Sequence, residues 1–553
     1  MVQEFRGNLI DVVHQRIFAA TVRVSGGKIV AIEETDQAGS NFLLPGFVDA
    51  HVHIESSMLT PAEFSRAAVQ HGTVATVSDP HEIGNVLGVE GVRYMLKNAE
   101  RGPLKIFFGA PACVPATIFE TAGATIDAQQ VAQLLDDQRI CYLSEMMNYP
   151  GVLAGDAEVL AKIQAALDRG KPVDGHAPGV RGADAARYFG RGISTDHECI
   201  SKAEALDKLR CGAKILIREG SAARNFEALY TLLDEFPQEC MLCSDDKHPD
   251  ELVEGHINVL VQRAVQRGVE LMNVLRAACV NPVLHYGLDV GLLRVGDDAD
   301  FIEVDNLQDW NVLQTVIRGR SVIGDPPASA DQVAPAAINK FAATPLSPDQ
   351  FKCRLPEGAE TVNVIQALDG ELVTQRQIFP VAVQDGLAVA DPQRDLLKLV
   401  VVSRYETAPP AIAFIHNFGL QHGAIASSVA HDSHNIVAVG TNDDDLCQAV
   451  NLVIQARGGL ALATGREHHL LALPVAGLMS DRPYPEVAEQ YTRLDRRAKE
   501  LGSCLRAPFM ALSFMALLVI PEIKLSDQGL FDGGRFEFLP LFNAAPQNEP
   551  PAS

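Results

Sequence analysis

The sequence has little aromatic character, few basic residues and no long hydrophobic run. Aromatic residues make up 6% of the 553 positions, and tryptophan occurs once. Lysine and arginine total 46 against 70 aspartates and glutamates, which gives a formal net charge of −24. This acidic balance argues against nucleic acid and anionic membranes as partners, because both require a basic surface. The longest apolar stretch, APFMALSFMALLVIP, is too short to span a bilayer and is expected to form a buried helix or strand.

Signals for disulfides and for export are also lacking. The 10 cysteines are irregularly spaced, which indicates reduced thiols rather than a disulfide framework. The N-terminal MVQEFRGNLIDVV shows no basic region followed by an apolar one, so no signal peptide is expected. Hydrophobic residues reach 47% and charged residues 21%, as is typical of a folded globular protein. We therefore expect a soluble cytoplasmic protein of about two or three domains.

Short apolar strands alternate with amphipathic helical segments through the first half of the chain. The strand candidates are FVDAHVH, TVATVSD, LKIFFGA, ICYLSEM, PVDGHA, ISTDHE, AKILIRE and ECMLCSD. Eight such units are typical of a (β/α)8 barrel, with a doubly wound open sheet as the alternative. The stretches on either side contain short strands, including a hairpin around Gly26 and Gly27, that could pair into one small β-sandwich.

The predicted fold class is therefore α/β: a (β/α)8 TIM-type barrel with a small discontinuous β-sandwich and a C-terminal α+β domain. The predicted boundaries are 1–44 for the first part of the sandwich, 45–290 for a metal-dependent barrel, 291–325 for the second part of the sandwich, 326–344 for a linker, 345–541 for the α+β domain and 542–553 for a disordered tail.

His51 and His53 lie one residue apart at the end of the first barrel strand. Side chains alternate between the two faces of a strand, so both imidazoles point the same way and could share one metal ion. Barrels of this type carry their chemistry at the C-terminal strand ends. Alone, each polar residue there has a structural explanation, such as a hydrogen-bonded histidine or a helix cap. Together they predict a convergent metal site, because four further candidates also end strands: Glu145, His176, His197 and Asp245.

Six ligands exceed the three that one catalytic ion needs, so two ions are predicted, with Glu145 as the candidate bridge. Imidazole and carboxylate suit Zn, Fe, Mn or Co, and the lack of thiolate ligands argues against a structural zinc site. Two ions would hold a bridging hydroxide that acts as a nucleophile near neutral pH.

A second zinc pattern competes with this interpretation. His53-Ile54-Glu55 and Cys240-Met241-Leu242-Cys243 match the two halves of the nucleoside-deaminase signature. The halves lie far apart, the cysteine pair lacks its preceding proline, and both cysteines fall within an apolar strand. We interpret them as core thiols.

Longer motifs resemble a known family. PGFVDAHVH, the later histidines and the strand-8 aspartate resemble the amidohydrolase superfamily. Other amidohydrolases usually place a carboxylated lysine where Glu145 stands, whereas a glutamate is expected in the bacterial adenine deaminases. The similarity to that group extends over nearly the whole length and includes SDPHEIGNVLG, SEMMNYPGV, DGHAPG, STDHE, REGSAARN, CSDDKHP and HGAIASSVAHDSHNIVAVG.

The resemblance implies a binuclear divalent metal site that contains Mn or Fe, with Zn as an alternative. In it, His51 and His53 would hold one ion, and the pair His176 and His197 would hold the other. Glu145 would bridge, while Asp245 would bind the first ion and act as acid and base. The implied reaction is the hydrolysis of adenine to hypoxanthine and ammonia, a step of purine salvage.

Further roles are hypotheses about residues beyond the metal ligands. Glu82, in SDPHEIGN, is the candidate that protonates ring N1 of the substrate, although it also suits a helix N-terminus. Arg218 and Ser221, in REGSAARN, are candidates for contacts with the purine. The segment AHDSHN, at 430–435, could close over the barrel mouth or pack at a domain or subunit boundary, and we favour the boundary. The large apolar C-terminal unit predicts a homo-oligomer, a dimer or larger.

Two other functions stay open. Another amidohydrolase that acts on a cyclic amide would share the barrel ligands, although Glu145 in place of lysine and the C-terminal unit argue against it. A non-catalytic metal-binding or regulatory protein would also hold ions, but no basic or apolar docking surface in the sequence supports that class.

Overall fold

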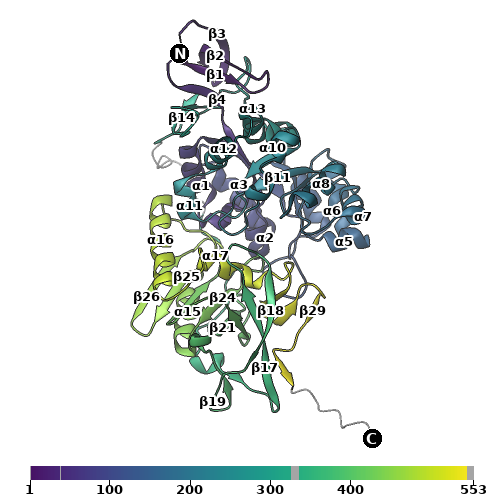
Figure 1. The fold of residues 1–553 in the computed structure, drawn as a ribbon, viewed down its shortest axis with the longest axis vertical. Coiled ribbons are helices and arrows are strands. Elements are labelled where there is room, and N and C mark those ends of the chain that lie inside the picture. Colours follow the sequence, from purple (N-terminus) through teal and green to yellow (C-terminus); the bar gives the residue numbers. More distant parts are fainter. Residues whose placement is uncertain (1, 38, 325–335, 545–553) are drawn as a thin grey trace.

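The computed structural model describes residues 2–37, 39–324 and 336–544, which form three tiers (Figure 1). A mixed sheet lies at the N-terminal end, a region of parallel strands and helices in the middle, and a C-terminal unit at the opposite end. Most of the predicted linker (326–344) and tail (542–553) lies outside the described residues. In the part of the chain that is described, no helix combines the length and the apolarity needed to cross a membrane.

One seven-stranded sheet combines the first strands of the chain with strands that follow the central region. β4 and β13 pair antiparallel, with Pro45 opposite Phe301, so the predicted pairing of the two flanking stretches is confirmed. The described strands of both stretches belong to one sheet, whereas the prediction was a two-layered β-sandwich. The predicted hairpin is β2–β3, and Gly26 and Gly27 turn it with φ of 60° and 80°, which glycine adopts without strain. In sheet order the strands are β15 (Arg320–Ser321), β14 (Val312–Ile317), β13 (Phe301–Val304), β4 (Phe42–Pro45), β1 (Gln3–Asp11), β2 (Arg16–Ser25) and β3 (Lys28–Glu34).

All eight strands predicted for the central region are present. They are parallel, and nearly all of their residues are buried, as expected for strands that are covered on both faces. The first sheet contains β5 (Phe47–Val52), β6 (Thr73–Ser78), β7 (Lys105–Ala110), β8 (Ile140–Met146) and β9 (Val173–Gly175), and the second contains β10 (Thr195–Asp196), β11 (Lys214–Arg218) and β12 (Cys240–Cys243).

Backbone contacts connect these two parallel sheets at both of their edges. Val52, at the end of β5, forms a parallel bridge with Asp245, which follows β12. The Asp245 N–H donates to the His51 carbonyl at 2.9 Å. At the other edge, the Ser194 N–H donates to the Val173 carbonyl of β9 at 2.9 Å. The C-terminal ends of the first and last strands therefore lie side by side.

Amphipathic helices separate the strands. In α6, Val159, Ile163 and Ala166 recur at helical spacing and are buried, while the Asp156 carboxylate caps the helix by accepting from the Val159 N–H at 3.0 Å. The helices of this region are α1 (Pro61–Ala68), α2 (His81–Leu87), α3 (Val89–Ala99), α4 (Ala128–Leu135), α5 (Tyr149–Ala154), α6 (Ala157–Leu167), α7 (Gly182–Phe189), α8 (Lys202–Arg210), α9 (Phe226–Leu229), α10 (Leu232–Glu235), α11 (Pro249–Glu254), α12 (Ile257–Gln266), α13 (Leu271–Leu275) and α14 (Asn281–Tyr286).

The C-terminal unit (336–544) is built on a nine-stranded sheet in the order β18-β17-β22-β21-β24-β23-β25-β26, with β30 paired to β17. α15 (Asp443–Ala456) contacts β23 and β25, and α16 (Tyr484–Glu500) contacts α11 of the central region. The apolar stretch predicted as a buried helix or strand contains the helix α17 (Pro508–Ser513).

The strands of this sheet are β17 (Ala359–Ala367), β18 (Thr374–Pro380), β21 (Leu397–Val402), β22 (Ala411–His416), β23 (Ala424–Ser427), β24 (Ile436–Gly440), β25 (Gly459–Thr464), β26 (Glu467–Ala472) and β30 (Phe542–Ala544). Two three-stranded sheets complete the unit, with β16 (Cys353–Arg354), β19 (Val383–Gln384) and β20 (Leu387–Ala388) in one and β27 (Ile523–Ser526), β28 (Gly529–Asp532) and β29 (Glu537–Phe538) in the other. β30 includes the first residues of the predicted tail.

Candidate metal centre

The structure brings all six predicted ligands together at the C-terminal ends of the parallel strands. His51 and His53 project from the end of β5, and their Nε2 atoms are 3.1 Å apart. Asp245 joins them from the end of β12, with Oδ1 3.5 Å from His51 Nε2 and 3.4 Å from His53 Nε2. These three residues are at most 3% exposed. They form one compact donor group in which all ligand atoms lie within 4.8 Å of one another.

Glu145, at the end of β8, connects this group to the remaining histidines. Its Oε1 is 3.2 Å from His53 Nε2, and its Oε2 is 3.1 Å from His197 Nε2 and 2.6 Å from His176 Nδ1. Burial raises the pKa of the Glu145 carboxyl, but His176 and His197 outweigh burial and hold that pKa well below its ordinary value. The carboxylate is therefore ionised and faces a different set of nitrogens with each oxygen, as a bridging ligand does.

The donor atoms suit divalent ions. His53 Nδ1 lies 3.2 Å from the backbone oxygen of Asp79, so Nδ1 carries the proton and Nε2 keeps a lone pair for a ligand. The separations of 3.1, 3.4 and 3.5 Å among His51, His53 and Asp245 match the spacing of ligands about 2.0–2.2 Å from one shared ion. Nitrogen and oxygen donors without thiolate fit Mn, Fe or Zn.

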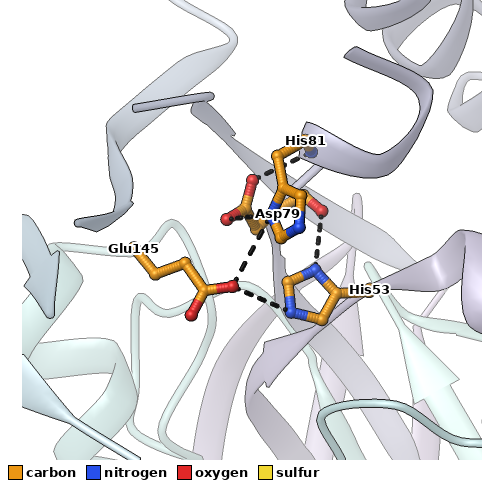
Figure 2. A group of neighbouring side chains, drawn as sticks. All are labelled: His53, Asp79, His81 and Glu145. Carbon is orange, nitrogen blue, oxygen red and sulfur yellow. Dashed lines mark hydrogen bonds and ion pairs between the residues drawn. The ribbon is translucent and has the colours of Figure 1, made fainter. Parts of the chain in front are cut away.

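Two further residues, Asp79 and His81, belong to this site and were missed in the sequence (Figure 2). His81 Nδ1 lies 2.9 Å from Asp79 Oδ2 and 3.6 Å from Glu145 Oε1. Both residues follow β6 in the motif SDPHEIGN, from which only Glu82 was selected. Their position directly after a buried strand, the criterion that identified the other ligands, was the signal that could have revealed them.

Arg218, predicted to contact the purine, lines the cavity at the metal ligands and is paired with two carboxylates. Its Nη1 lies 2.5 Å from Asp245 Oδ2, and its Nη1 and Nη2 lie 2.5 and 2.9 Å from the two oxygens of Glu198. Burial raises the pKa of Asp245, but Arg218, His51 and His53 hold that pKa well below its ordinary value. Glu198 directly follows His197 in STDHE and was also missed. The guanidinium thus fixes the orientation of the Asp245 carboxylate.

Ser221 was predicted to contact the purine, yet its hydroxyl is already committed elsewhere. Its Oγ donates to Glu251 at 3.0 Å and accepts from the His248 N–H at 2.9 Å. Among the described residues, Ser221 is not one of those that line the cavity at the metal ligands. This position supports a structural role at the start of α11.

The segment AHDSHN reaches the site, so the boundary interpretation favoured from the sequence is incomplete. His431 Nδ1 contacts Glu82 Oε1, and His434 Nε2 lies 2.5 Å from Glu82 Oε2. Burial raises the pKa of the Glu82 carboxyl, but His431 and His434 together lower it well below its ordinary value. Hydrophobic periodicity carries no information on contacts between residues as far apart in the chain as Glu82 and His431. The sequence alone therefore could not decide whether this segment reaches the site.

A small cavity of about 30 Å³ lies among the ligands. The central region supplies the metal-ligand residues of its wall, and the C-terminal unit supplies Leu372, His431, Asp432, Phe514 and Leu517. A neighbouring cavity of about 250 Å³ shares Glu198, Arg218 and Leu372 with it. The space at the metal ligands therefore adjoins a larger space between the two parts of the chain.

Comparisons with known proteins match two separate parts of the chain to two family models. Residues 42–322 match the model of the amidohydrolase family, and residues 371–537 match that of the adenine deaminase C-terminal domain. An adenine deaminase of Salinibacter ruber is 56% identical over 97% of this chain and 98% of its own length. One from Methanosarcina acetivorans is 51% identical over 98% of this chain and 100% of its own length. A β-aspartyl dipeptidase structure from Fervidobacterium islandicum aligns with 58% of this chain and 97% of its own, at 17% identity and a TM-score of 0.45.

Proposed function

The chain belongs to the adenine deaminases of the amidohydrolase family, and from this we propose that it hydrolyses adenine to hypoxanthine and ammonia. The observation that carries the proposal is the position of Glu145 between His53 and His197, within a buried donor set of nitrogen and oxygen atoms. The comparisons cover both the central region and the C-terminal unit, so they support the activity of the whole chain.

We propose that the site holds two divalent ions, Mn or Fe, with Zn as the alternative. His51, His53 and Asp245 would hold one ion. His176 and His197 would hold the other, with Glu145 shared between them. When bound, the two ions would acidify a coordinated water and so provide a nucleophile for C6 near neutral pH.

Asp245 is proposed to move the proton of the reaction. Its buried carboxylate lies beside the donor group and is held by Arg218, so it can accept the proton of the attacking water without changing position. It would then return the proton to the departing amino group. Arg218 would act through Asp245 rather than on the substrate.

Glu82 is proposed to deliver a proton to ring N1, which would make C6 more electrophilic. Its carboxylate lines the cavity and contacts His431. Burial lowers the pKa of His431, but Glu82 and Asp246 outweigh burial and raise it to about 9. The His431 imidazolium therefore supplies the proton that an ionised Glu82 would pass to N1.

We also infer that the eight parallel strands form one closed (β/α)8 barrel. The bridge between Val52 and Asp245 supports closure between the first and last strands, β5 and β12. The hydrogen bond from Ser194 to Val173 supports closure between β9 and β10. The predicted domain boundaries, the homo-oligomeric state and the cytoplasmic location stay predictions. Sedimentation velocity of the purified protein tests the oligomer.

Asp245→Asn tests the proposed chemistry. An amide cannot accept the proton, so turnover should fall by about 10²–10⁴-fold while the protein stays folded. Adenine and hypoxanthine absorb ultraviolet light differently, so a spectrum recorded during the reaction measures turnover. Asp184→Asn, an exposed aspartate in α7, serves as the matched control. Full activity of the Asp245→Asn enzyme, or no conversion of adenine by metal-loaded wild type, would contradict the proposal.

A further inference from the structure

The C-terminal unit provides one wall of the cavity at the metal ligands. Leu372 and Leu517 are apolar, and Phe514 is stacked on the ring of His431 with 4.5 Å between ring centroids and 13° between planes. Apolar and aromatic walls with a few fixed polar groups are typical of sites for flat heterocycles. This wall therefore has the composition of a surface that binds a flat heterocycle.

A chain of hydrogen bonds fixes the orientation of the His431 ring. The Ala430 N–H donates to His434 Nδ1 at 3.2 Å, so Nδ1 is an acceptor and the proton of neutral His434 lies on Nε2. That Nε2–H donates to Glu82 Oε2 at 2.5 Å, and His431 Nδ1–H donates to Glu82 Oε1. Glu82 is thereby held at both oxygens, and His431 has one ring nitrogen, Nε2, left for another partner.

Two polar atoms of this wall lack a hydrogen-bond partner among the described residues, although both are buried. They are Nε2 of His431 and Oδ2 of Asp432. Both residues are at most 3% exposed and line the cavity. Buried polar atoms in folded proteins are nearly always paired, so two unpaired atoms of neighbouring residues in a cavity wall indicate a place for a ligand.

His81 relates these atoms to the metal ligands. One of its ring nitrogens, Nδ1, lies 3.6 Å from Glu145 Oε1, and the other, Nε2, lies 3.7 Å from Asp432 Oδ1. Asp432 is therefore separated from the bridging carboxylate by the width of one imidazole. A purine with C6 at the metal ligands places its five-membered ring farther out, toward such a position.

We propose that His431 and Asp432 recognise the edge of adenine formed by N3 and N9–H. His431 Nε2–H donates to N3, and Asp432 Oδ2 accepts from N9–H. N3 and N9 are bonded to the same carbon, so an acceptor and a donor lie next to each other on the base. Consecutive residues of the protein offer the complementary donor and acceptor. This assignment rests on the proposed function, because it takes adenine as the substrate.

The test compares substrate analogues on the full-length, metal-loaded enzyme. Wild type should prefer adenine to 9-methyladenine by about 100-fold or more in kcat/KM, because methylation removes the N9 donor and leaves Asp432 unpaired. In Asp432→Ala, kcat/KM for adenine should fall by about 10- to 100-fold, and the preference should shrink to below about 10-fold. Asp432→Asn keeps an acceptor oxygen and should give an intermediate preference. His431→Ala should reduce the preference for adenine over 3-deazaadenine in the same way.

Three controls separate recognition from structure. The ratio for adenine against 7-deazaadenine should stay constant in every variant, because N7 lies on the opposite edge. His434→Gln should lower turnover through Glu82 without changing the analogue ratios. Asp445→Asn alters a buried aspartate of α15 that accepts a hydrogen bond from Asn442 and does not line the cavity. This variant should change neither the turnover of adenine nor the analogue ratios. Metal content and melting temperature are measured for each variant.

Failure of the assignment to His431 and Asp432 can be told apart from failure of the proposed function. If wild type deaminates adenine and the preference over 9-methyladenine is unchanged in Asp432→Ala and Asp432→Asn, the assignment is overturned while the proposed function stands. If wild type does not deaminate adenine, the proposed function itself fails. If Asp432→Ala does not fold, the isosteric Asp432→Asn provides the same comparison.

Discussion

Arg218 holds Asp245 by an ion pair of 2.5 Å between Nη1 and Oδ2 inside the protein, where both residues are at most 5% exposed. The same guanidinium also forks onto both oxygens of Glu198. Arg218, predicted from the sequence to contact the purine, lines the cavity, and its ion pairs support a second hypothesis, that it positions the carboxylate proposed to transfer the proton. The distinction changes what its substitution should do.

Arg218→Gln should reduce kcat with little effect on KM for adenine. Removing the guanidinium takes one charged partner away from each of two buried carboxylates, a change that destabilises proteins by about 3–5 kcal/mol. Arg218→Lys should rescue only part of the loss, because an ammonium lacks the planar, bidentate geometry of the guanidinium. Steady-state kinetics and melting temperatures of the two variants measure this. A large rise in KM at unchanged kcat would instead support the predicted contact with the purine.

Glu145→Gln should lower the metal content from about two ions per chain toward one. A neutral amide offsets less of the charge of two dications than the carboxylate between His53 and His197. Metal analysis after extensive dialysis checks the result independently of activity. The exposed Glu90→Gln, in α3, is the matched control and should retain the wild-type content. Two retained ions in Glu145→Gln would contradict the bridging role.

Asp49→Ala should destabilise the inferred barrel at the seam between its first and last strands. Asp49 Oδ1 accepts from the Ser244 N–H at 2.9 Å, and Oδ2 lies 2.8 Å from His256 Nε2. Loss of a fully buried carboxylate with these partners should lower the free energy of unfolding by about 3–5 kcal/mol. Thermal denaturation is the measurement, with Asp11→Ala in the N-terminal sheet for comparison. Equal melting temperatures would show that this seam contributes little.

Glu120→Gln should make stability less dependent on pH. Burial, and then the nearby Asp432 carboxylate, raise the pKa of Glu120 from 4.5 to about 8. The folded state thus binds this proton more tightly than the unfolded chain, and the resulting stabilisation declines as the pH rises from 4.5 through 8. Glutamine mimics the protonated acid, so the variant should melt at a higher temperature than wild type at pH 9 and at a similar one at pH 5. The opposite order at pH 9 would refute the pKa shift.

The metal ligands could be predicted because their signal is local. Each of His51, His53, Glu145, His176 and His197 lies at or directly after a buried strand, and parallel strands bring their C-terminal ends to one edge. Asp79 and Glu198 carry the same local signal and were passed over. Ser221 has no such signal, and its hydroxyl is used in bonds within the fold.

The sequence by itself determined the eight strands, the hairpin at Gly26 and Gly27 and the convergence of the histidines, because periodicity and strand ends are properties of neighbouring residues. Only the tertiary structure decided that His431 and His434 hold Glu82 and that Arg218 holds Asp245. The physical reason is that a buried charge must find a partner in space. Any of several distant segments could supply that partner, and the packing of the C-terminal unit on the central region selects which one does.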